Sequence, residues 1–224
     1  MLDFSNVLAA WPVFLSGLWI TALLTLISCA LGAILGIGCA WCRVQGPRGA
    51  RVAVACYVEF FRNTPFIVQI FFIYFGLPAI GLKFASFPAA IIALTVNLGA
   101  YACEIVRAGI EATPRGQIEA AQCLGLNRWQ TFTRVVLPPA LSRVWPAMIS
   151  QLVIIMLATA VCSLISTAEL SYVTNRIAAQ TFRQFESYIV VTLLYLLLSI
   201  CFRRLLQWLG PRFLFGCAPA GVGR

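Results

Sequence analysis

The sequence predicts an all-α integral membrane protein with five transmembrane helices and a cytosolic elbow between the third and the fourth. Of its 224 residues, 61% are hydrophobic and 10% are charged, whereas a soluble domain carries about 25% charged residues. Long charge-free runs alternate with short arginine-rich segments, the arrangement that the positive-inside rule describes. The length suits a single transmembrane domain, 1–224.

The five spans follow from the apolar runs. Residues 4–42 carry no charge, and as one helix this run would be nearly twice as long as the ~30 Å hydrocarbon layer. The first span is therefore predicted at 13–41, with the beginning of the run at the membrane interface. The other spans are predicted at 64–82, 87–106, 144–165 and 187–206. Small residues allow helices to pack closely in membranes; those of the first span are Gly17, Gly32, Gly36 and Gly38.

Orientation follows from the basic residues between the spans. Of the sixteen basic residues, four lie in the segment 43–62, five in the segment 107–143 and four in the tail from Arg203 to Arg224. The alternate gaps hold only Lys83, Arg176 and Arg183. The positive-inside rule then places the N-terminus outside and the C-terminus in the cytosol. We expect a multi-pass protein of the bacterial inner membrane. Its net charge of +9 is then explained by orientation in the lipid bilayer and not by binding to nucleic acid.

The segment 107–143 carries clear helix signals but does not span. Thr113 with Pro114 predicts a helix start, with a capping hydroxyl followed by proline at the first helical position. Gly125 predicts the end of this helix. Asn127 with Gln130 predicts a capped second helix, which is expected to end before the next proline pair. These signals define a helix–glycine–helix elbow at 113–136.

The elbow also carries small and apolar side chains, which are Ala120, Ala121, Leu124, Leu126, Trp129 and Phe132. Apolar residues exposed on a cytosolic segment indicate a surface for a partner. The alternative is an elbow that packs only on its own spans.

The stretch Glu119-Ala120-Ala121, with Leu124-Gly125, Phe132 and Leu137-Pro138 after it, resembles the EAA signature of permeases in ATP-binding-cassette importers. In that family the signature forms a coupling helix that docks into a groove of the ATPase. The resemblance implies a set of ATPase-coupling residues, which are Glu119, Ala120, Ala121, Leu124, Gly125, Leu126 and Phe132.

Other stretches narrow the resemblance to the polar amino-acid branch of these type I importers. The run Phe60-Phe61-Arg62-Asn63-Thr64-Pro65 and the run Tyr74-Phe75-Gly76-Leu77-Pro78 look like its second span, and Thr181-Phe182 with Phe185-Glu186 fits the approach to its last span. The resemblance implies three kinds of protein partner: ATPase subunits, a second permease subunit in a homo- or heterodimer, and a periplasmic amino-acid-binding protein.

Chemistry in the chain itself is not expected. The ATPase signature is absent, and the one lysine, Lys83, lies on the predicted outer side. There is no histidine and no nucleophile–base pair. Cys39 and Cys42 lack the further ligands that a zinc site needs. We therefore expect neither an enzyme nor a bound metal or cofactor.

Two pairs of opposite charge lie three residues apart near the predicted cytosolic faces, Glu59 with Arg62 and Glu104 with Arg107. This spacing allows each pair to meet on one helix face. The pairs either neutralise charge at the membrane edge or brace the elbow and an inner gate.

Polar side chains within spans are candidates for a substrate pathway. They are Gln69, Asn97, Gln151, Thr159 and Ser163. Hydrogen bonding between helices is the alternative use of such residues. Many members of the resembling family carry a charged or amide residue before a Thr-Ser in the fourth span, and the stretch 156–161 has none. The chain then either lacks a substrate site of its own, with specificity in the binding protein, or forms half of a heterodimer whose partner carries the charge.

A secondary transporter or channel subunit for small solutes is the competing function. That class typically needs an ion or proton relay inside the membrane, and the interiors of the predicted spans hold no Asp, Glu or Lys.

Overall fold

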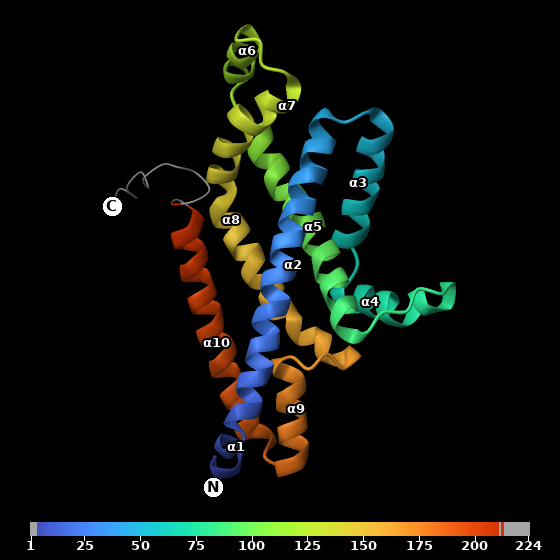
Figure 1. Cartoon of the computed structure of the whole chain (residues 1–224), viewed down its shortest axis with the longest axis vertical. Coiled ribbons are helices and arrows are strands. Elements are labelled where there is room, and N and C mark those ends of the chain that lie inside the picture. Colours follow the sequence, from blue (N-terminus) through green and yellow to red (C-terminus); the bar gives the residue numbers. More distant parts are fainter. Residues whose placement is uncertain (1–3, 211, 213–224) are drawn as a thin grey trace.

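Residues 4–210 and 212 are described by the computed structural model, and their ordered elements are all helices (Figure 1). The all-α prediction is confirmed. Arg224, counted in the basic tail, lies outside the described residues. Among the described residues, four helices are long and apolar enough to cross a membrane, and a bent pair makes a fifth if its two arms count as one span.

The helix α2 (Trp11–Gln45) forms the axis of the bundle, after the short α1 (Ser5–Ala9). Its 35 residues extend over roughly 50 Å, so α2 reaches beyond the hydrocarbon layer. It packs along α5 (Ser86–Glu111). A Cβ atom added at Gly32 would come within 2.7 Å of Leu98, so this helix pair depends on the missing side chain. Gly36 likewise lies against Ala102 of α5, Gly17 lies against Leu170 near the other end of α2, and Gly38 faces open space.

The second predicted span is bent. Helix α3 (Arg48–Arg62) runs beside α2 and α5, and α4 (Phe66–Phe71) with η1 (Phe72–Gly76) and η2 (Leu77–Ile80) leaves it at 109° (Figure 1). The sequence predicts a gap at 43–62, where α3 lies, and a single span at 64–82. Pro65 explains the break, because proline lacks the N–H donor and disfavours helical geometry in the residue before it.

The elbow consists of α6 (Arg115–Cys123), α7 (Arg128–Gln130) and η3 (Thr131–Val136). Gly125 has the left-handed φ of 73° expected of a stop signal, and the predicted capping box of Asn127 and Gln130 is confirmed. The predicted start is wrong in one detail: Pro114 occupies the cap position, and the Thr113 hydroxyl is buried without a hydrogen-bond partner.

The chain continues from η3 directly into α8 (Leu137–Ala158) and η4 (Thr159–Ile165). The expected stop before the prolines is wrong, because the helix continues through Pro138 and Pro139 at the junction of η3 and α8. Helix α9 (Leu170–Thr181) and α10 (Gln184–Leu209) complete the chain. The elbow lies at one end of the molecule, and α1 and α9 lie at the other (Figure 1).

Candidate functional site

The elbow divides its predicted coupling residues between an outer and an inner face. Leu124 is 80% exposed, and Glu119, Ala120 and Gly125 are exposed beside it. Ala121 and Phe132 are buried and Leu126 is half-buried. The outer residues present a small, mostly apolar surface at the tip, and the inner ones hold the elbow to the rest of the chain.

An aromatic cluster joins the elbow to the end of α2. The rings of Trp41 and Trp129 meet edge to face with centroids 5.6 Å apart, and Phe132 lies 6.1 Å from Trp129 and 6.3 Å from Trp41. Such contacts add to the apolar area buried by the rings. The sequence analysis identified Trp129 and Phe132 as docking residues but missed Trp41, since nothing local links positions so far apart.

The turn between the elbow helices is fixed by backbone hydrogen bonds. The Gly125 N–H donates to the Gln122 carbonyl at 2.9 Å, and the Leu126 N–H donates to the Ala121 carbonyl at 3.2 Å. Arg143 of α8 donates to the Ala112 carbonyl at 2.8 Å, so α8 also holds the point where the elbow leaves α5. These bonds make the elbow a stiff extension of α5 and α8.

A charge cluster lies below the elbow, where α2, α3 and α5 meet. Glu104 contacts Arg107 at 2.7 Å, Arg43 at 3.6 Å and Arg62 at 4.0 Å. Arg107 also contacts Glu111 at 2.6 Å. Glu104 therefore connects three helices by its contacts with arginines from each, a larger cluster than the single pair that the sequence predicts.

The other predicted pair does not form. Glu59 instead accepts a hydrogen bond from Asn63 at 2.9 Å, and the Arg62 guanidinium lies over the Tyr101 ring, 5.6 Å from its centroid. Arg62 is thus directed toward α5 rather than along its own helix.

Gln69 and Asn97, predicted for the substrate pathway, are brought together. The Asn97 amide donates to Gln69 Oε1 at 2.9 Å, and both residues are buried. Gln69 Nε2 donates to the Phe61 carbonyl at 2.8 Å and to the Thr64 carbonyl at 3.0 Å. These bonds satisfy carbonyl groups that the bend after α3 leaves without helical partners. Gln69 also lines an otherwise largely apolar cavity of about 320 Å³.

The remaining pathway candidates lie on α8 and η4. Thr159 is fully buried and donates to the Met156 carbonyl at 2.6 Å, and Ser163 donates to the Ala160 carbonyl at 2.7 Å. Gln151 is half-buried. Both hydroxyls bond to their own helix, so the geometry around them is that of helix packing and not of converging ligands.

A buried carboxylate at the opposite end of the molecule escaped the sequence analysis. Glu169 is fully buried and accepts hydrogen bonds from the N–H groups of Ser171 at 2.9 Å and Tyr172 at 2.7 Å. It also accepts one from the Tyr195 hydroxyl at 2.7 Å. Burial raises the pKa of this carboxyl, and the three donors oppose the rise. A glutamate is an uncommon helix cap, which explains why its position before α9 gave no signal.

Within the described residues, no group of three or more His, Cys, Asp or Glu side chains could hold a metal ion.

Comparisons with known proteins agree with this geometry. Residues 30–215 match the family described as binding-protein-dependent transport system inner membrane component. The chain is 34% identical over 200 residues to the arginine transport system permease protein ArtQ of Bacillus subtilis, and the aligned part covers 89% of this chain and 91% of that protein. It is 32% identical over 212 residues to the glutamine transport system permease protein GlnP of Escherichia coli strain K12, and the aligned part covers 94% of this chain and 97% of that protein.

A solved structure has the same fold. The crystal structure of an amino acid ABC transporter with histidines contains a chain that superposes with a TM-score of 0.84 at 32% identity, covering 95% of this chain and 100% of that one.

Proposed function

Because the chain belongs to the family of binding-protein-dependent transport system inner membrane components, we propose that it forms the translocation pathway for a polar amino acid and couples it to a separate ATPase. The chain is an amino-acid permease of the ATP-binding-cassette importer class and not an enzyme. An extracytoplasmic binding protein delivers the substrate, and a second permease subunit completes the pathway. Membership in this family favours an ATP-driven importer over a secondary transporter.

The exposed tip of the elbow is the observation that supports coupling. Leu124 is 80% exposed next to the exposed Glu119 and Ala120. An apolar side chain so fully in water is a candidate anchor for a partner. We propose that this tip enters the ATPase, and that Ala121, Leu126 and Phe132 contribute by holding it in place.

Coupling needs a connection between the ATPase and the spans. The elbow continues without a break into α8 and is held to α2 by Trp41, so a displacement of the tip moves both helices. A ligand shifts a conformational equilibrium only by binding the two states differently. We propose that ATP binding closes the ATPase pair, pulls the two elbows together and exchanges inward-open for outward-open arrangements.

The charge cluster of Glu104 lies between the elbow and the spans. We propose that it braces the cytosolic gate, since it joins three helices that such a motion would separate. This assignment requires that the elbow and the C-terminus lie in the cytosol and that the N-terminus lies outside.

The substrate class rests on the relatives, which are named for arginine and glutamine. The polar groups of Gln69, Asn97, Thr159 and Ser163 bond to the chain itself. We therefore propose that these residues and Gln151 line the pathway without setting its specificity, which resides in the binding protein.

Reconstitution tests this function. Proteoliposomes would hold the permease with its ATPase, and binding protein loaded with labelled arginine, glutamine or histidine would be added outside. Uptake of at least one of them is expected to require both ATP inside and the binding protein. Uptake by permease alone, driven by an ion gradient, would favour the secondary-transporter alternative.

A further inference from the structure

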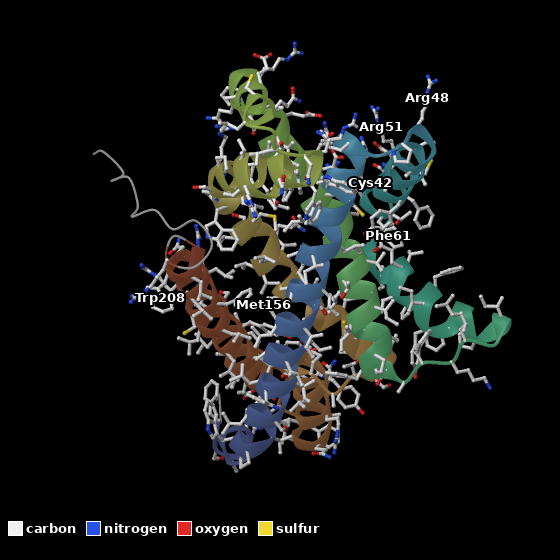
Figure 2. The ribbon with its side chains drawn as sticks, turned by 45° about the horizontal axis from the view of Figure 1, so that its top comes forward. Cys42, Arg48, Arg51, Phe61, Met156 and Trp208 are labelled. Atoms are coloured by element: carbon white, nitrogen blue, oxygen red, sulfur yellow. The ribbon has the colours of Figure 1, made fainter. Side chains whose placement is uncertain are left out.

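A basic cavity lies at the elbow end of the molecule, on the side away from α8. Its volume is about 460 Å³, and α2, α3 and α5 line it. Its charged residues are Arg43, Arg48, Arg51, Arg107 and Glu111. Figure 2 shows Arg48 and Arg51 at the outer end of α3, near the end of α2 that carries Cys42.

The carboxylates near the cavity are already engaged. Glu111, the one acidic residue that lines it, contacts Arg107 at 2.6 Å. Glu104 lies next to it and contacts Arg107 and Arg43. Arg48 and Arg51 form no ion pair with any carboxylate of the described residues. The cavity therefore carries unbalanced positive charge.

The position of these two arginines increases the imbalance. They lie in the first turn of α3, which contains no acidic residue. The first turn of a helix has unpaired N–H groups and the positive end of the helix dipole, both of which favour an anion. Arginines there are unfavourable unless an anion compensates them.

An apolar stripe extends from this charge along α3. Val52, Cys56 and Phe60 follow Arg48 at intervals of four residues, so all four lie on one helix face. Val52 is 58% and Phe60 61% exposed, and Cys56 is exposed as well. The opposite side of α3 packs on α2 and α5, so the stripe faces away from the bundle.

A phospholipid matches both parts of this surface. Basic pockets on the cytosolic side of membrane helices bind anionic headgroups, and guanidinium groups bind phosphate through paired hydrogen bonds. Free phosphate would use the arginines but not the apolar stripe.

We propose that the arginine cavity binds the phosphate of an anionic phospholipid from the cytosolic leaflet, with an acyl chain along Val52, Cys56 and Phe60. The headgroup would neutralise the start of α3 and hold α3 against α2 and α5. This inference depends on the proposed orientation but not on transport, and its test measures lipid binding alone.

The test uses the full chain in detergent, titrated with phosphatidylglycerol and followed by native mass spectrometry. Wild type is expected to bind one phosphatidylglycerol molecule with defined affinity. The double variant Arg48→Gln/Arg51→Gln is expected to bind it about tenfold more weakly or worse, since each arginine near an anionic headgroup contributes measurably. Arg48→Lys/Arg51→Lys keeps the charge and should retain most of the binding, which separates loss of charge from misfolding.

The matched control is Arg203→Gln/Arg204→Gln, which removes the same charge from two exposed residues of α10. Its phosphatidylglycerol affinity should equal that of wild type, and phosphatidylcholine should bind weakly to every variant. The proposal would be overturned if both double glutamine variants lost phosphatidylglycerol affinity equally, or if wild type bound phosphatidylcholine as tightly as phosphatidylglycerol.

Two further arms identify the source of the phosphate. Phe60→Ser should weaken phosphatidylglycerol binding if an acyl chain covers the stripe. Displacement of the lipid by millimolar inorganic phosphate, with no effect of Phe60→Ser, would overturn the lipid assignment in favour of free phosphate. Loss of the bound lipid on assembly with the ATPase or a second permease would show that a protein occupies this surface instead.

Discussion

At the residue scale, two carboxylates hold together helices that are distant in sequence. Glu104 contacts arginines from α2, α3 and α5 near the elbow, and Glu169 joins the start of α9 to Tyr195 of α10 at the opposite end. Glu169 is fully buried and Glu104 is half-buried, and carboxylates persist in such places where partners compensate the loss of water.

Replacing Glu104 tests the charge cluster. Glu104→Gln leaves Arg43, Arg62 and Arg107 without their shared partner. Breaking a fully buried ion pair is costly, and partial exposure to water reduces that cost here. The free energy of unfolding should fall by about 1–2 kcal/mol, measured by denaturant titration of the protein in mixed micelles. Glu59→Gln is the control, because Glu59 is exposed and forms no such cluster; an equal loss there would contradict the role of the cluster.

Glu169 gives the protein a pH-dependent stability. Burial raises the pKa of this carboxyl in the folded state from the ordinary value of 4.5, so folding favours the protonated form. Its contribution is fully present below pH 4.5 and is lost as pH rises through the raised pKa. Glu169→Gln should remove this part of the pH profile of the thermal midpoint, and the exposed Glu119→Gln should not. Parallel profiles for wild type and Glu169→Gln would contradict the assignment.

At the element scale, the bend after α3 and the turn in the elbow are the features that determine shape. Pro65 ends α3, and Gln69 satisfies the carbonyl groups that the bend exposes. Gly125 turns the elbow in a left-handed conformation that side chains with a Cβ atom adopt at a cost of about 1–2 kcal/mol.

Gln69→Ala tests the bend. It removes the donors to the Phe61 and Thr64 carbonyls and the acceptor for Asn97. Leaving buried polar groups unpaired should lower the free energy of unfolding by roughly 2–3 kcal/mol. The measurement is denaturant titration in micelles. Ile67→Ala on the same helix is the control, since its side chain is 40% exposed, and a larger loss there would show that packing rather than hydrogen bonding holds the bend.

Two glycines of the elbow form a matched pair for testing its stiffness. A Cβ atom at either Gly116 or Gly125 would meet open space, and only Gly125 has a positive φ. Gly125→Ala should strain the turn by about 1 kcal/mol and reduce ATPase association and uptake, whereas Gly116→Ala should be neutral or stabilise α6. Equal uptake in both variants would argue against a rigid elbow.

At the scale of the whole molecule, apolar runs and arginine spacing were enough to predict the helical membrane class, and Gly125 with the Asn127–Gln130 capping box predicted the turn of the elbow but not its two ends. The bend at Pro65 is signalled by the proline itself, but the run after it, 66–82, carries no charge and so favours a single span. The contact of Trp41 with the elbow, the cross-helix partners of Glu104 and the burial of Glu169 could not be predicted. They arise from pairs of residues far apart in the chain, and local patterns carry no information on such distances.

The central claim is that the exposed tip of the elbow attaches the permease to its ATPase. Co-purification of the tagged permease with that ATPase tests it directly. Leu124→Asp places a charge in the proposed contact, and Leu82→Asp makes the same change at a 51% exposed position after η2, far from the elbow. We expect Leu124→Asp to lose the ATPase while Leu82→Asp and wild type retain it. Full retention of the ATPase by a folded Leu124→Asp permease would contradict it.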